Sequence, residues 1–128
     1  MHRISKTFQF EAAHRLATLP PEHKCSHRHG HSYTVQVVVA AERLTGPGFV
    51  VDFGELRPLR RYLAETFDHR DLNDVLDVEP TSENLAHHLF HWCAEHLVLP
   101  KGAHVERVRV SETASTWAEY APDGGTVW

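Results

Sequence analysis

The sequence predicts an α+β fold in which an antiparallel four-stranded sheet is covered on one face by two helices. Apolar residues alternate over residues 3–14, 29–40, 105–112 and 116–120, and they recur every three or four residues over 56–67 and 85–97. A period of two indicates strands, and a period of three to four indicates helices. The resulting order, strand-strand-helix-helix-strand-strand, is typical of an α+β domain. At 128 residues, we expect a single domain over residues 1–128.

Composition excludes several classes of protein. Hydrophobic residues at 41% and charged residues at 23% are ordinary for a soluble globular protein. A net charge of −4 provides no basic surface for nucleic acid. No apolar run approaches the roughly 20 residues that span a bilayer, so we expect no membrane partner. Without an apolar secretory segment at the start, and with only two cysteines, the chain is predicted to be cytoplasmic, with Cys25 and Cys93 as free thiols.

The first predicted strand, residues 3–14, ends its apolar face in a histidine. Phe8, Phe10, Ala12 and His14 share one parity, which Lys6 interrupts nearer the start. In a strand, residues of one parity point to the same face of the sheet. Pro20 and Pro21 then mark a loop over residues 18–24.

The stretch from Cys25 to Tyr33 gathers one thiol and three imidazoles. A strand beginning near His29 places His29 and His31 on one face, ahead of an apolar run that continues to Val39. The glycine between the two histidines leaves the opposite face bare at that point, so backbone or a ligand can approach closely. A second apolar face therefore ends in histidines.

Pairing of these two strands as antiparallel neighbours brings the three histidines together. The end of the first strand then meets the start of the second, so that His14 lies beside His29 and His31. Three neutral imidazoles suit Zn²⁺ and leave a fourth tetrahedral position for water or substrate. The alternative is three core histidines bonded to backbone carbonyls, although burying adjacent imidazoles costs several kcal/mol unless each finds a partner.

The middle of the chain predicts a turn at residues 46–48, a short strand over 49–51 and an amphipathic helix. The apolar stripe of this helix runs from Leu56 to Phe67, and Pro58 is tolerated only in the first turn. A loop over residues 68–74 follows and begins with Asp68 and His69. The acid either terminates the helix or orients the imidazole for proton transfer.

A second helix is predicted to begin at residues 80–83, with Thr81 or Ser82 as its cap. Its buried stripe includes Cys93 as a small core residue. The helix also carries histidines four residues apart, but without the adjacent glutamate of a zinc metalloprotease helix. We interpret its histidines as mostly surface residues: His87, His88, His91 and His96.

The last two strands form a hairpin, and Glu112 ends the apolar face of the first of them. A carboxylate in that place can accept two N–H bonds from a guanidine-like heterocycle. Alternatively, it is an exposed acid of the hairpin.

Several motifs together resemble one enzyme family. They are Phe10-Glu11-Ala12-Ala13-His14, Cys25 followed by His29-Gly30-His31, Val51-Asp52-Phe53, Phe67-Asp68-His69 with Leu72-Asn73, Pro80-Thr81-Ser82-Glu83-Asn84, and Glu112-Thr113. In this order the chain closely resembles the 6-pyruvoyltetrahydropterin synthase family. The three residues between Cys25 and His29 resemble the 6-carboxytetrahydropterin synthase branch of queuosine biosynthesis. That branch often has an apolar residue where this chain has Arg28.

The resemblance implies the tunnelling fold (T-fold), in which trimers close a barrel and two trimers stack as a homohexamer with active sites at subunit interfaces. It implies zinc on His14, His29 and His31. It also implies that Cys25 is the catalytic thiol, that Asp68 and His69 are its acid–base partners, and that Glu112 anchors the pterin.

The implied substrate is 7,8-dihydroneopterin triphosphate, and the implied products are 6-carboxytetrahydropterin, acetaldehyde and triphosphate. Lys24, Arg28 and Arg15 are candidate contacts for the triphosphate, which needs local positive charge in an acidic protein. Two other functions stay open. The chain could be a 6-pyruvoyltetrahydropterin synthase, which releases triphosphate only, or a non-catalytic zinc- or pterin-binding homologue.

Overall fold

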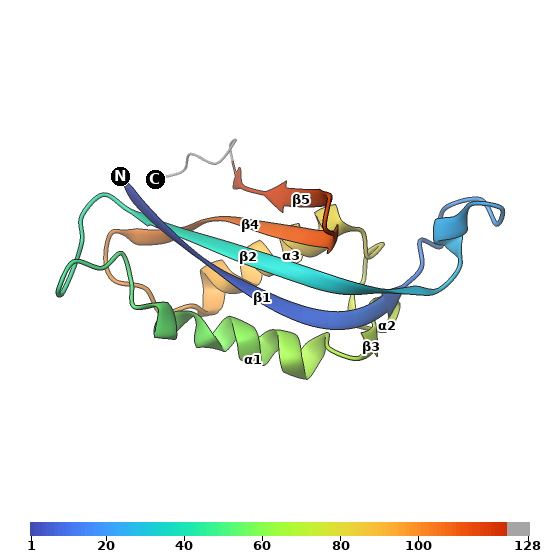
Figure 1. The fold of residues 1–128 in the computed structure, drawn as a ribbon, viewed down its shortest axis with the longest axis horizontal. Helices are drawn as coiled ribbons and strands as arrows, with labels where there is room; N and C mark the ends of the chain where they lie inside the picture. Colours follow the sequence, from blue (N-terminus) through green and yellow to red (C-terminus); the bar gives the residue numbers. More distant parts are fainter. Residues whose placement is uncertain (123–128) are drawn as a thin grey trace.

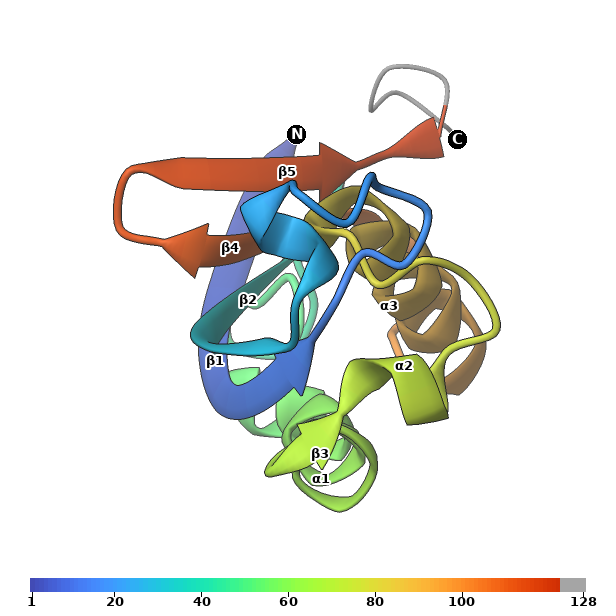
Figure 2. The same ribbon diagram turned by 90° about the vertical axis from the view of Figure 1, so that its right-hand side faces the viewer.

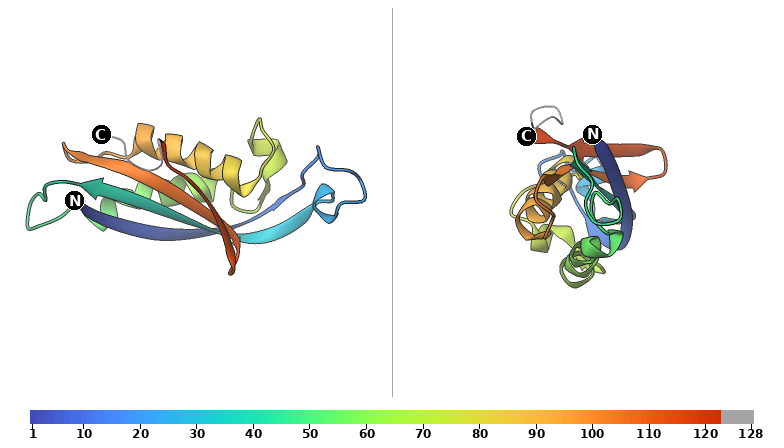
Figure 3. Two further views of the ribbon diagram at one scale, coloured as in Figure 1. Left: turned by 90° about the horizontal axis from the view of Figure 1, so that it is seen from above. Right: turned by 90° about the vertical axis from the view of Figure 1, so that its left-hand side faces the viewer.

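A twisted sheet runs the length of the molecule, and the helices pack on one side of it (Figures 1 and 3). The computed structural model describes residues 1–122, so the predicted domain of residues 1–128 includes a terminus, 123–128, outside the described part. The strands are β1 (His2–His14), β2 (His29–Ala41), β3 (Arg70–Asp71), β4 (Ala103–Thr113) and β5 (Thr116–Tyr120). The helices are α1 (Arg57–Thr66), α2 (Leu72–Val75) and α3 (Ser82–His96), with 3₁₀ turns η1 (Lys24–Ser26) and η2 (Phe53–Leu56).

The sheet has the order β3-β1-β2-β4-β5. Four of these strands pair antiparallel, as predicted, and the register of β1 against β2 runs from His2 opposite Ala41 to His14 opposite His29. The prediction of a purely antiparallel four-stranded sheet is wrong in one respect. The two-residue strand β3 pairs parallel with β1 and makes the sheet five-stranded and mixed. A strand of two residues is too short to produce an alternating pattern.

The core lies between the sheet and helices α1 and α3. Tyr33 and the valines that follow it at every second position of β2 are fully buried. The helix stripes that cover them are also buried, as their spacing predicts, and comprise Leu56, Leu59, Leu63 and Phe67 on one side and Leu85, Leu89 and Cys93 on the other. The strand alternation and the helical period therefore meet in one hydrophobic cluster.

Two local predictions fail. Residues 49–51 do not form a strand, because Phe49 makes only an isolated bridge to Thr45 around a tight turn. That turn contains Gly46 and Gly48 at φ values of 55° and 121°, which glycine adopts without strain. The predicted loop over residues 68–74 instead contains β3 and the beginning of α2. In contrast, Thr81 is the cap of α3, one of the two predicted candidates. Its side chain accepts a hydrogen bond from the backbone N–H of Asn84.

Residues 1–122 contain no helix that is both long and apolar enough to cross a membrane.

Candidate active site

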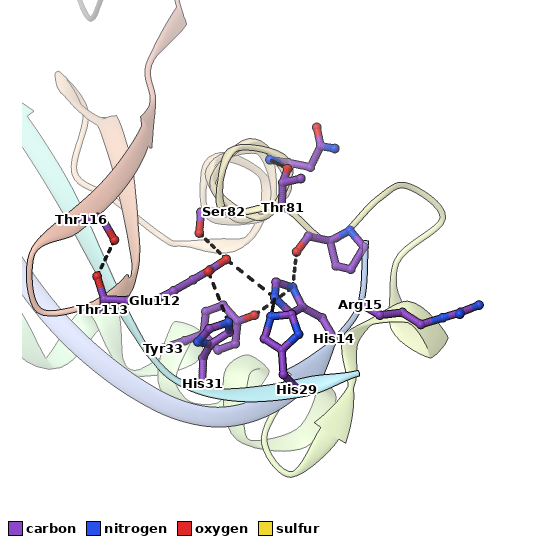
Figure 4. Close-up of polar contacts among 12 residues, drawn as sticks. His14, Arg15, His29, His31, Tyr33, Thr81, Ser82, Glu112, Thr113 and Thr116 are labelled. Atoms are coloured by element: carbon purple, nitrogen blue, oxygen red, sulfur yellow. Dashed lines mark hydrogen bonds and ion pairs between the residues drawn. The ribbon is translucent and has the colours of Figure 1, made fainter. Parts of the chain in front are cut away.

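The register of β1 against β2 brings three histidines together at one end of the sheet, as predicted from the alternation (Figure 4). The ring centroids of His14, His29 and His31 lie 4.7 to 5.0 Å apart. One ring nitrogen of each histidine lies within 4.8 Å of the other two, so the three imidazoles form a possible metal site. His14 and His29 come from paired positions on neighbouring strands, whereas His31 is two residues further along β2.

Backbone carbonyls orient two of these rings. The Nδ1 of His14 lies 2.7 Å from the carbonyl oxygen of Pro80, and the Nδ1 of His29 lies 2.6 Å from that of His27. A carbonyl can only accept, so the hydrogen-bond network assigns the proton to Nδ1 in both rings. The lone pair is then on Nε2, which faces the cluster, as in the usual outer-shell arrangement of a metal-binding histidine.

The donor set fits zinc. The Nε2 atoms of His14 and His29 lie 3.1 Å apart, and two nitrogens on a tetrahedral zinc ion would lie about 3.3 Å apart. The Nε2 of His31 is buried and forms no hydrogen bond. Burial lowers the pKa of His31, although Glu112 opposes this, so that the neutral form that binds metal is favoured.

A cavity of about 780 Å³ opens over the histidine cluster. This size suits a small-molecule ligand. Four elements line the cavity besides β1 and β2. Lys24 and Cys25 come from η1, residues 81–83 from the start of α3, residues 112–113 from β4, and residues 116–118 from β5.

Glu112 lies in this cavity and not on an exposed part of the hairpin (Figure 4). The hydroxyl of Ser82 donates to its Oε1 over 2.8 Å, and its Oε2 lies 3.4 Å from the Nε2 of His31. The side chain remains 24% exposed, so its carboxylate is oriented by Ser82 and still accessible to a ligand.

Of the three basic residues predicted to contact the triphosphate, one lies at the cavity and two lie elsewhere. Lys24 lines the cavity, together with the half-buried Cys25. The side chain of Arg15 points away from the histidine cluster in Figure 4. Arg28 is paired with Asp71, with 2.7 Å between Nε and Oδ2. Neither Arg15 nor Arg28 lines this cavity.

Asp68 and His69 do not lie in the same cavity as Cys25 within the chain. Both follow the outer edge of β1, where Oδ1 of Asp68 accepts the backbone N–H of Glu11 over 2.9 Å. The His69 side chain is 78% exposed, with its Nε2 3.6 Å from Oδ2 of Asp68. Its backbone has a φ of 59°, which is uncommon for a residue with a side chain and is often found at functional sites.

Among the residues of the cavity wall that the sequence does not predict as site residues, Ser82 and Trp117 stand out. The sequence predicts Ser82 only as a possible helix cap, but its hydroxyl donates a hydrogen bond to Glu112. Trp117 is 57% exposed beside the cavity, and the guanidinium of Arg109 lies 3.7 Å from its ring centre. The signal that the sequence offers is a tryptophan in a short strand at the edge of the predicted sheet, and the structure shows that it is exposed.

The chain matches known proteins over nearly its whole length. The profile of the family described as 6-pyruvoyl tetrahydropterin synthase matches residues 3–123. A 6-carboxy-5,6,7,8-tetrahydropterin synthase from Synechocystis is 42% identical, with 91% of each chain covered. A putative enzyme of the same name from Archaeoglobus fulgidus is 37% identical, covering 91% of this chain and 92% of the relative.

Solved structures share the fold. A 6-pyruvoyl tetrahydropterin synthase from Caenorhabditis elegans superposes with a TM-score of 0.81 at 26% identity, covering 95% of this chain and 96% of the other. An uncharacterised protein from Wolinella succinogenes superposes with a TM-score of 0.84 at 21% identity, covering 95% and 98% of the two chains. The fold of the single chain is thus the one predicted by resemblance, apart from the additional parallel strand β3. On its profile match and these relatives, the chain belongs to the 6-pyruvoyl tetrahydropterin synthase family.

Proposed function

We propose that the protein is a zinc-dependent 6-carboxy-5,6,7,8-tetrahydropterin synthase. It converts 7,8-dihydroneopterin triphosphate and water to 6-carboxytetrahydropterin, acetaldehyde and triphosphate. The observation that carries the proposal is the single cavity containing three convergent histidines, Cys25 and Glu112. The names of the relatives at 37% and 42% identity support the choice of product.

His14, His29 and His31 would hold the zinc ion through their Nε2 atoms. The chemistry that zinc supplies in such a site is Lewis-acid polarisation of ligand oxygens, which acidifies a neighbouring C–H bond. The carbonyls of Pro80 and His27 keep the first two rings in the required tautomer.

Glu112 anchors the pterin in this proposal. Its carboxylate would accept two N–H bonds, one from the amino group and one from the neighbouring ring nitrogen, in a charge-assisted fork. Ser82 holds one carboxylate oxygen over 2.8 Å and so limits the rotation of the acceptor. Lys24, on the same cavity, is the basic residue best placed for the triphosphate.

Cys25 is the proposed base. Its Sγ, as thiolate, would take the proton from the substrate side-chain carbon, because thiol and histidine cluster share one cavity. His69, oriented by Asp68, would move protons during carbon–carbon cleavage. Since these two residues lie outside the Cys25 cavity of their own chain, we propose that a neighbouring subunit of a homohexamer supplies them.

From the resemblance to the 6-carboxytetrahydropterin synthase branch, we assign the product to queuosine biosynthesis. From the composition of the chain, we assign the protein to the cytoplasm. The rival product is 6-pyruvoyltetrahydropterin, the activity named for the C. elegans structure. The two reactions differ in carbon–carbon cleavage, so only the first releases acetaldehyde.

Product analysis tests the assignment. Purified, zinc-loaded protein is incubated with dihydroneopterin triphosphate, and all products are identified by mass. We expect 6-carboxytetrahydropterin and acetaldehyde in equal amounts. Triphosphate release without acetaldehyde would support the pyruvoyl product, and absence of turnover would support the non-catalytic binder.

Subunit mixing tests the shared site. Cys25→Ala and His69→Ala are each expected to be inactive alone. After dissociation and joint reassembly, about one quarter of the sites should combine an intact Cys25 with an intact His69 from another subunit. Recovery of activity is expected to follow this fraction, and light scattering should show a hexamer. Failure to recover activity in mixed hexamers would contradict a site shared between subunits.

A further inference from the structure

The corner between β3 and α2 holds both ends of the loop that carries Cys25. The side-chain amide of Asn73 bonds twice to the backbone of Arg15, accepting its N–H over 2.9 Å and donating to its carbonyl over 3.0 Å. Two residues earlier, Asp71 is paired with Arg28 at 2.7 Å. Arg15 begins the loop of residues 15–28 and Arg28 ends it. Figures 1 and 2 show β3 and α2 at the same end of the molecule as this loop.

Arg15 and Arg28 are each the chain neighbour of a histidine in the cluster. Arg15 follows His14 in the chain, and Arg28 precedes His29. The two ends of the loop are also joined by a backbone bond from the N–H of Leu16 to the carbonyl of Cys25, at 2.8 Å. A shift of either end would therefore move an imidazole and the thiol together.

The side chain of Asn73 continues the hydrogen bonding between β3 and β1 beyond the end of β3. Along the outer side of β1, β3 pairs only with Ala12 and Ala13. The amide of Asn73 presents one acceptor and one donor to the next exposed backbone position, Arg15, as a further strand residue would. It thereby satisfies backbone groups that the edge strand would otherwise leave to water.

Asp71 contacts both Asn73 and Arg28, and so links Asn73 to the second end of the loop. Its Oδ1 accepts the backbone N–H of Asn73 over 3.0 Å, which fixes the start of α2. Its Oδ2 makes no aligned hydrogen bond, so Arg28 meets it as an ion pair. The Asp71 side chain is 14% exposed, whereas the Arg28 side chain is 65% exposed, so solvent screens the pair from the arginine side and the buried carboxylate fixes where the arginine lies.

We propose that Asn73 and Asp71 are positioning residues for the active site. Asn73 bonds the backbone of the residue after His14, and Asp71 pairs with the side chain of the residue before His29. Together they set the separation of the imidazoles and the place of Cys25. The proposal rests on the proposed function for its metal and its thiol. It gives Asn73 a role beyond the motif in which it occurs, and it makes Arg28 a loop anchor instead of a phosphate ligand.

Cobalt binding to Asn73→Ala is the first test, because Co²⁺ replaces zinc and its visible absorption reports ligand geometry. We expect the dissociation constant for Co²⁺ to rise about 10-fold, at the low end of the range for outer-shell partners, and the absorption bands to weaken. The rate at which iodoacetamide labels Cys25 should change as well. The control is Val105→Ala, a core truncation on β4, which should lower the melting temperature but leave all three measurements unchanged.

The ion pair is tested by rescue. Arg28→Ala should shift the cobalt spectrum and the Cys25 labelling rate in the same direction as Asn73→Ala, and Arg28→Lys should restore both by keeping a charge near Asp71. Arg43→Ala, at an exposed arginine beyond the opposite end of β2, is the matched control.

A lower melting temperature with unchanged cobalt affinity, spectrum and Cys25 labelling in Asn73→Ala would overturn the proposal and leave a purely structural role. These measurements do not depend on turnover. If the wild-type protein bound cobalt but made no pterin product, the proposed reaction would fail while the positioning role stood. If it bound no cobalt, the labelling rate of Cys25 alone would decide.

Discussion

The histidines at the ends of β1 and β2 and the histidines of α3 are similar in number but opposite in arrangement. Those of the strands come from two elements, and their ligand nitrogens converge within 4.8 Å. Those of α3 follow one another along a single helix. Among the described residues, they form no comparable group with a third ligand.

The difference lies in what each ring nitrogen contacts. In the strand cluster, the carbonyl of Pro80 accepts the hydrogen bond from Nδ1 of His14, and Nε2 therefore faces the other two histidines. On α3, the Nε2 of His88 lies 2.7 Å from the hydroxyl of Tyr62, and the rings of His87 and His91 pack against Tyr120. A histidine therefore becomes a ligand candidate when a neighbour occupies its outer nitrogen and other donors meet its inner one.

Metal content gives the sharpest test of this comparison. His29→Ala with His31→Ala should remove nearly all zinc from a protein that otherwise holds about one ion per chain, because a single imidazole remains. His87→Ala with His91→Ala should retain the zinc. Elemental analysis of both purified double variants decides it, and loss of zinc from the α3 variant would reverse the assignment.

The sequence predicted the strand cluster because the signal was local. Two alternating faces each ended in histidine, and antiparallel pairing does the rest. The orientations of Arg15 and Arg28 could not be predicted in this way. They depend on Asn73 and Asp71, and Asn73 is 58 residues from Arg15 in the chain. A composition argument places positive charge near a phosphate, but it does not include a hydrogen bond from an amide so far away in the chain.

His88 shows the same limit. The helical period predicts His88 as a surface residue, yet it is half-buried. Tyr62 on α1 covers it: the tyrosine hydroxyl contacts His88, and its ring stacks on Trp92 with centroids 4.2 Å apart. Helix–helix contacts of this kind depend on the packing of α1 against α3, which the spacing within either helix does not contain.

The two cysteines repeat the comparison on a smaller scale. Cys25→Ala should lower turnover by roughly 10² to 10⁴, the range for a lost general base, while zinc is retained. Cys93 is fully buried, and burial raises the pKa of its thiol to about 12, so Cys93→Ala should reduce stability without loss of turnover. Labelling with iodoacetamide at neutral pH, followed by peptide mass analysis, should modify Cys25 alone. Loss of zinc in Cys25→Ala would instead identify the thiol as a ligand.

Two tyrosines that contact histidines should respond differently to loss of the hydroxyl. The Tyr33 oxygen lies 3.1 Å from the Nδ1 of His14, so Tyr33→Phe should weaken metal binding by up to about 10-fold. Tyr62→Phe removes the partner of His88 and should cost about 1 kcal/mol of unfolding free energy. Metal titration and urea unfolding of both variants separate the effects. Equal loss of metal affinity in both variants would contradict the division between the two groups.

The smallest expected effect is a pH dependence of stability that comes from His88. Burial lowers the pKa of His88, and the neighbouring His87 and His91 lower it further, so the folded protein favours the neutral ring. The resulting stabilisation is complete above the unfolded value near 6.5 and is lost as the pH falls from that value through the lower folded pKa.

His88→Gln keeps a hydrogen-bond acceptor for Tyr62 but cannot titrate. The difference in unfolding free energy between the wild-type protein and His88→Gln should therefore change as the pH falls from about 7.5 to 5, with the wild type losing more. Urea unfolding at several pH values measures this difference. Contributions from the metal site and from groups that do not contact His88 are common to both proteins and cancel. A difference that stayed constant over that range would mean that His88 carries the same charge in the folded and unfolded states, and that its burial does not favour the neutral ring.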